Sequence, residues 1–91
     1  MIHELSASTV AVITGASSGI GRATALALAE KGLRLSLLAR SENDLSGVAG
    51  EAKARGASGA GHFVCDVRDE AAVNRAVAST LSRFGRIDVL I

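Results

Sequence analysis

The stretch VAVITGASSGIG, residues 10–21, begins as an apolar run, breaks into a turn with three glycines and continues into a helical pattern. This order of strand, glycine loop and helix is how a parallel α/β protein forms a phosphate site. The N–H groups of the loop and of the first helical turn point at one spot, where the helix dipole favours negative charge. Gly15 would permit the tight turn, Gly19 would let a pyrophosphate approach the backbone, and Gly21 would let the helix pack closely.

Length and composition restrict the class of protein. The 91 residues suffice for one small domain or part of one, and 48% hydrophobic with 21% charged residues is typical of a globular chain. A net charge of +1 gives no basis for a nucleic-acid partner or an anionic membrane. The single cysteine, Cys65, fits a reducing compartment, so we expect a cytoplasmic protein. Neither a metal-ligand cluster nor a membrane-spanning run stands out, so no metal site and no membrane partner are predicted.

The remaining elements follow from hydropathy after a polar lead-in at residues 1–8. Four apolar runs predict strands, at residues 9–13, 33–39, 62–65 and 87–91. Three helical periodicities predict helices, at residues 20–31, 41–52 and 69–84. Residues 56–61 are predicted to form a turn. The inward face of the first helix is expected to consist of Ile20, Ala23, Thr24, Ala27 and Leu28, with a second apolar side at Ala25, Leu26 and Ala29.

Strands that alternate with helices require parallel pairing and right-handed crossovers. The predicted fold is therefore α/β, a Rossmann-type doubly wound parallel sheet with strand order 3-2-1-4. The sheet would be incomplete, and residues 1–91 would form the N-terminal part of a single dinucleotide-binding domain. A ligand is expected at the switch point between the first and fourth strands, beyond their carboxyl ends.

Read from Thr14, the glycines follow the pattern T-G-x-x-x-G-x-G. In this pattern the sequence resembles the classical members of the short-chain dehydrogenase/reductase family, over nearly the whole chain from about residue 9 onward. The resemblance implies a nicotinamide dinucleotide as cofactor. It implies that the phosphates are held by residues of the glycine loop, namely Gly15, Ser17, Ser18, Gly19, Ile20 and Gly21.

Two further positions bear on which dinucleotide binds. A carboxylate at the end of the second strand would hold a ribose hydroxyl, whereas this chain has Ala39 followed by Arg40, whose guanidinium can pair with a 2′-phosphate. The resemblance likewise favours NADP over NAD when a basic residue stands here. Asp66 and Val67 match the pair that contacts adenine in the family, although Asp66 could equally cap the third helix. Arg68 stands where the family often has Thr or Ser, which leaves that cap open.

The resemblance implies hydride transfer between NADPH and the carbonyl or alcohol of a small substrate. The family's catalytic Ser and its Tyr-x-x-x-Lys pair have no counterpart here, since the chain contains no Tyr, so the 91 residues are predicted to be inactive alone. A homo-oligomer is expected for the full-length protein. The alternative is a truncated, non-catalytic nucleotide-binding or interaction module, in which residues 89–91 would form an unpaired apolar edge. A methyltransferase would need an acidic residue after the second strand, and none is present.

Overall fold

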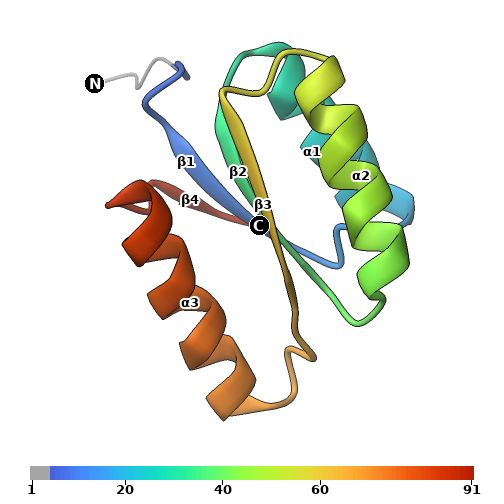
Figure 1. Ribbon diagram of the computed structural model, residues 1–91, viewed down its shortest axis with the longest axis vertical. Helices are drawn as coiled ribbons and strands as arrows, with labels where there is room; N and C mark the ends of the chain where they lie inside the picture. The colour runs from blue at the N-terminus through green and yellow to red at the C-terminus, as the bar shows by residue number, and fades with distance from the viewer. Residues whose placement is uncertain (1–4) are drawn as a thin grey trace.

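The computed structural model describes residues 5–91, so the first half of the predicted lead-in lies outside the described residues. The elements alternate along the chain in the order β1 Val10–Thr14, α1 Gly19–Glu30, β2 Arg34–Ala39, α2 Glu42–Ala54, β3 Gly59–Val64, α3 Glu70–Phe84 and β4 Val89–Leu90 (Figure 1). All pairings are parallel and the strand order is β3-β2-β1-β4. The predicted Rossmann-type sheet with order 3-2-1-4 is thus confirmed.

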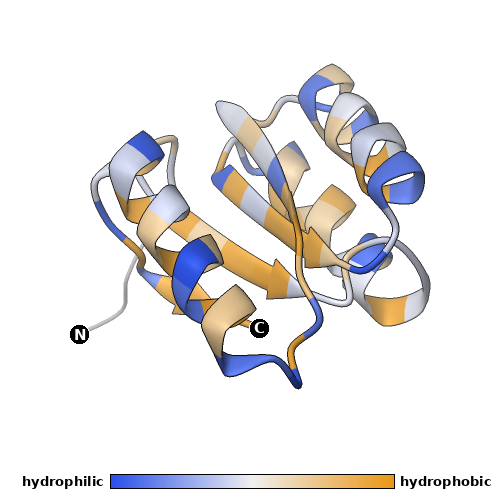
Figure 2. Ribbon diagram, turned by 60° about the horizontal axis from the view of Figure 1, so that its bottom comes forward, coloured by the Kyte–Doolittle hydropathy of each residue, from blue (hydrophilic) through white to orange (hydrophobic). Residues whose placement is uncertain are grey.

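The sheet separates two helical layers. Helices α1 and α2 cover one face and α3 covers the other (Figure 1). Because successive side chains of a strand alternate between faces, β1 directs Ala11 and Ile13 into the core beneath α1 and α2, and Val12 into the core beneath α3. The strands are largely hydrophobic and the outer helix surfaces largely polar (Figure 2). Burial on both faces explains why the strands appear in the sequence as continuous apolar runs.

The apolar face predicted for α1 is wrong in part: Leu28 packs against the core, but Ala23 and Ala27 are exposed. Ile20 is 86% exposed, whereas Ala25, Leu26 and Ala29 are the residues that the helix buries. Hydrophobic periodicity fits both sides of this helix, because both are apolar. Gly21 decides between them: a Cβ at that position would lie 2.1 Å from the carbonyl oxygen of Gly15, so its side of the helix must face the loop and the sheet.

The start of β3 was also predicted wrongly. Three residues assigned to a turn, Gly59, Ala60 and Gly61, belong to the strand and pair with residues 34–36 of β2. Glycine lowers strand propensity, but it also permits another element to approach closely. A Cβ at Gly59 would lie 3.1 Å from Cε1 of Phe84, at the end of α3. Glycine is therefore favoured at both positions because the last turn of α3 packs on this end of β3.

The predicted helix boundaries agree with the structure to within a few residues. Gly32 and Gly85 follow α1 and α3 with φ angles of 83° and 80°, the left-handed conformation that ends a helix. Strand β4 is shorter than the predicted 87–91, but main-chain hydrogen bonds of 2.9 Å from Asp88 N to Val10 O and from Ile91 N to Val12 O extend its pairing with β1. Within residues 5–91, no helix is long and apolar enough to cross a membrane.

Candidate functional site

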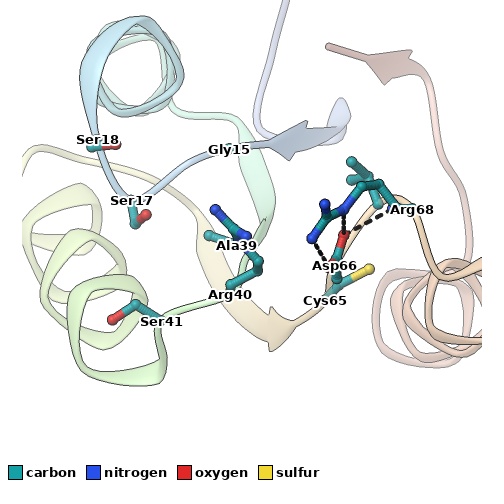
Figure 3. Close-up of a pocket in the computed structure, with 10 residues that line it drawn as sticks. Gly15, Ser17, Ser18, Ala39, Arg40, Ser41, Cys65, Asp66 and Arg68 are labelled. Carbon is teal, nitrogen blue, oxygen red and sulfur yellow. Dashed lines mark hydrogen bonds and ion pairs between the residues drawn. The ribbon is translucent and has the colours of Figure 1, made fainter.

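A cleft of about 510 Å³ lies where β1, β2 and β3 end. It is lined by residues from the three loops that follow these strands, namely Gly15, Ser17, Ser18, Ala39, Arg40, Ser41, Cys65, Asp66, Val67 and Arg68 (Figure 3). Six of the predicted site residues are in this group. Gly19, Ile20 and Gly21 are not, because they form the first turn of α1 behind the loop. Parallel strands bring their carboxyl ends to one edge, which explains why residues far apart in sequence meet here.

The three glycines of the first loop have separable roles. Gly15 and Gly19 have φ angles of 59° and 57°, which residues with a side chain adopt only with strain. A Cβ at Gly19 would meet no atom within 4 Å, so the space beside this residue is open. Gly21 instead allows α1 to approach the carbonyl oxygens of Thr14 and Gly15. The loop therefore combines two left-handed residues with one close backbone contact.

The N-terminus of α1 differs from those of the other helices. The N-cap of α2 is Ser41, whose Oγ accepts from Asp44 N, and the N-cap of α3 is Asp69, whose carboxylate accepts from Ala72 N. The N-cap of α1 is Ser18, which makes no side-chain capping bond, and the first turn of α1 has no acidic residue. No side chain of residues 5–91 caps the N–H groups of this first turn, so they can donate to a ligand. The helix dipole favours an anionic one.

Arg40 is exposed at the end of β2 and extends toward the middle of the cleft (Figure 3). In the described part of the chain it makes no hydrogen bond or ion pair. Nearby carboxylates have other partners: Asp66 pairs with Arg68 at 2.8 Å, and Glu42 Oε1 accepts from His62 Nε2 at 2.9 Å. The guanidinium of Arg40 therefore keeps its full donor capacity for a ligand.

Asp66 receives three hydrogen bonds from one residue. Its Oδ1 accepts from Arg68 N at 2.9 Å and from Arg68 Nε at 3.1 Å, and its Oδ2 accepts from Arg68 Nη2 at 2.8 Å. These bonds from Arg68 hold the pKa of the Asp66 carboxyl well below its usual range, with a smaller contribution from the charge of Arg40. The helix cap is Asp69, so neither Asp66 nor Arg68 has that role.

Cys65 forms the floor of the cleft beside Asp66 and is 3% exposed. Burial is the main cause that raises the pKa of its thiol, followed by the charges of Asp66 and Asp69. The thiol is therefore protonated and packs as a small apolar group against Val12 and Leu38.

The predicted site residues do not include four that line the cleft, namely Ala39, Ser41, Cys65 and Arg68. Each directly precedes or follows a predicted site residue at the carboxyl end of a strand. The topology alone could have included them, because that edge is where such sheets bind ligands. Arg22, in contrast, lies outside the cleft and pairs with Glu51 of α2.

Sequence comparison supports the resemblance to the short-chain dehydrogenase/reductase family across most of the chain. The profile of the short chain dehydrogenase family matches residues 9–91. An A-factor type gamma-butyrolactone 1′-reductase (1S-forming) of Streptomyces virginiae is 49% identical over 80 residues, which is 87% of this chain and 30% of that protein. A D-threitol dehydrogenase of Mycolicibacterium smegmatis is 43% identical over 86 residues, 90% of this chain and 31% of that protein. The chain thus spans about a third of the length of the relatives it matches.

Solved structures of dehydrogenases have the same fold as this chain. A short chain dehydrogenase/reductase from Burkholderia phymatum in complex with NAD superposes with a TM-score of 0.90 at 35% identity, over 98% of this chain and 31% of that one. An alcohol dehydrogenase from Thermococcus sibiricus complexed with 5-hydroxy-NADP gives a TM-score of 0.85 at 42% identity, over 90% and 35%. Neighbours with this fold therefore bind either nicotinamide dinucleotide. By its glycine loop, its strand order and these matches, the chain belongs to the short-chain dehydrogenase/reductase family.

Proposed function

We propose that this chain is the cofactor-binding part of an NADPH-preferring oxidoreductase, which transfers hydride to or from the carbonyl or alcohol of a small substrate. The observation that carries the proposal is the uncapped N-terminus of α1, which opens beside an unpaired Arg40 at the carboxyl ends of three parallel strands. The N-terminus of α1 suits a pyrophosphate, and the guanidinium of Arg40 suits a further phosphate.

The residues of the chain fit the chemical groups of NADPH in order. The loop from Gly15 to Gly21, including Ser17, Ser18, Gly19 and Ile20, would bind the pyrophosphate through main-chain N–H groups. Arg40 would pair with the 2′-phosphate, and Asp66 with Val67 would contact the adenine. The open space beside Gly19 supports this fit, because a backbone without a side chain there lets a phosphate approach.

The preference for NADPH rests on charge. NAD binding in this fold uses a carboxylate at the end of the second strand, where this chain has Ala39. The carboxylates of Asp66 and Glu42 are held by Arg68 and His62, so they compete less for Arg40. A dianionic phosphate is therefore stabilised at Arg40, whereas a ribose hydroxyl has no charged acceptor there.

The nicotinamide ring supplies the hydride chemistry when the dinucleotide is bound. The residues described here bind and orient the cofactor, and none of them is assigned a catalytic role. A Ser and a Tyr-x-x-x-Lys pair, which the family resemblance implies for catalysis, are proposed to be contributed by residues outside these 91. On this proposal the 91-residue chain alone has no dehydrogenase activity.

The test uses the protein of native length and measures NADPH and NADH binding by fluorescence titration. Arg40→Ala should weaken NADPH binding by roughly tenfold or more, because a charge-assisted pair with phosphate is lost. NADH binding should change little. Lys53→Ala, which removes one positive charge from the last turn of α2, serves as the control. An equal loss for both cofactors, or no loss, would overturn the preference, and no binding of either would overturn the proposed function.

A further inference from the structure

Arg68 is the charged residue of the cleft that the proposed function leaves without a role. It precedes the cap of α3, and its side chain turns back over Asp66 instead of toward the helix (Figure 3). Two guanidinium nitrogens and the main-chain N–H all bond to the same carboxylate. This fork-like pairing fixes the plane of the guanidinium, yet the side chain remains 76% exposed. A long side chain is thus immobilised at the wall of the cleft without being covered.

The pairing decides what kind of group Arg68 can receive. Its positive charge is offset by the carboxylate of Asp66, so a phosphate is attracted more weakly here than at the unpaired Arg40. A guanidinium is planar and weakly hydrated, and it stacks readily on the face of an aromatic ring. Val67, which is 56% exposed and lines the same cleft, adds an apolar contact next to it. The chemistry favours a flat heteroaromatic ring over an anion.

The hydrogen-bond capacity of Asp66 also favours a flat heteroaromatic ring. A carboxylate has about two acceptor positions on each oxygen. Arg68 uses two on Oδ1 of Asp66 and one on Oδ2, so one position on Oδ2 remains. Hydrogen-bond directions at a carboxylate oxygen are broad, so the amino group of a ring that stacks on the guanidinium face can still donate to this position. Adenine combines a flat π system with such an amino group at its edge.

We propose that the adenine base stacks on the guanidinium of Arg68, and that Asp66 fixes the plane of this guanidinium. This inference rests on the proposed function, since it concerns the same dinucleotide. Arg68 thereby acts on affinity for the adenine half and not on the choice between the two dinucleotides, which depends on Arg40.

The test measures, on the protein of native length, the affinity for NADPH, for the nicotinamide mononucleotide half, and for the etheno-adenine analogue of NADP. The first contains adenine, the second lacks it, and the third keeps the flat base but has its amino group blocked. Arg68→Ala should weaken NADPH binding roughly three- to tenfold. Arg68→Lys, which keeps the charge but not the plane, should lose nearly as much. The mononucleotide should bind unchanged, and the etheno analogue should show the same loss as NADPH.

Arg75→Ala, at an exposed position of α3 outside the cleft, is the matched control. Full affinity in Arg68→Lys would show that only charge matters, and unchanged or tighter NADPH binding in Arg68→Ala would show that Arg68 competes for Asp66. Either result overturns the stacking role while leaving the proposed function intact. If the wild-type protein binds no dinucleotide, both inferences fail. Thermal unfolding of each variant establishes that the fold is retained.

Discussion

Ser36 Oγ and Thr80 Oγ1 lie 2.7 Å apart, and both residues are fully buried between β2 and α3. Thr80 Oγ1 also lies 2.8 Å from the carbonyl oxygen of Ala76, to which it donates its single hydrogen. The hydroxyl of Ser36 must therefore donate to Thr80. This pair joins the central strand to the helix layer that is otherwise built on a small apolar cluster, Val12, Leu38, Cys65 and Ala76.

Thr80→Val is expected to lower the free energy of unfolding by about 1 to 3 kcal/mol, because the buried Ser36 hydroxyl loses its acceptor. Urea denaturation followed by circular dichroism measures the change. Ser36→Ala combined with Thr80→Val should recover part of the loss, since no polar group is then left without a partner. A double variant that is as unstable as the sum of both single variants would contradict this account of the pair.

Two glycine substitutions should have opposite effects. Gly21→Ala places a Cβ within 2.1 Å of Gly15 O, so the loop or α1 must shift, and the cost should be about 1 to 3 kcal/mol or more. Gly47→Ala lies inside α2 with no atom within 4 Å of the new Cβ, and it should stabilise by up to about 1 kcal/mol. Thermal unfolding of both variants tests the pair, and equal effects would show that backbone approach is not what selects Gly21.

Some features of the fold follow from local sequence patterns, and others depend on contacts between distant residues. The glycine loop, the alternation of elements and the strand order follow from local patterns, since a buried parallel strand is a continuous apolar run. The face of α1 does not, because both sides of that helix are apolar and Gly21 selects one of them only through contact with the loop. The first residues of β3 do not either. They pair with β2, but Gly59 reads locally as a turn residue, and the side chain that requires a glycine there is Phe84, 25 positions later in the sequence.

In the candidate site, the positions of the residues were predictable from the sequence, but the orientation of Arg68 was not. The positions of Arg40 and Asp66 follow from the rule that ligands bind beyond the carboxyl ends of parallel strands. That rule gives no orientation for long side chains. The turn of Arg68 back onto Asp66 depends on the choice of Asp69 as the cap of α3, which releases Arg68 from the helix. Predicting it would require the relative geometry of Asp66, Arg68 and Asp69.

The thiol of Cys65 should be a slow nucleophile in the folded protein. It is buried, and burial together with the nearby charges of Asp66 and Asp69 raises its pKa, which reduces the thiolate fraction. Alkylation by iodoacetamide at pH 8 should be roughly tenfold slower or more than in the unfolded chain. Asp66→Asn should increase the rate in the folded state, because one charge that raises the pKa is removed. A native rate equal to the unfolded rate would show that the thiol is accessible.

The pair of Asp66 and Arg68 should make stability depend on pH in the acid range. The folded-state pKa of Asp66 lies below its ordinary value of 3.8, so the stabilisation is complete above that value. It should be lost as the pH falls from about 3.8 through the lower folded-state pKa, because the unfolded chain then binds more protons. Asp66→Asn should be less stable than the wild type at neutral pH, and the difference should shrink in acid.

Urea denaturation at a series of pH values between neutral and strongly acid measures this difference. Asp44→Asn, which removes an exposed carboxylate from the first turn of α2, is the charge-matched control. Arg68→Ala should reduce the acid dependence as Asp66→Asn does, because both variants remove the same hydrogen bonds. A difference between wild type and Asp66→Asn that stays constant from neutral to acid pH would mean that the carboxylate gains nothing from its partner in the folded state.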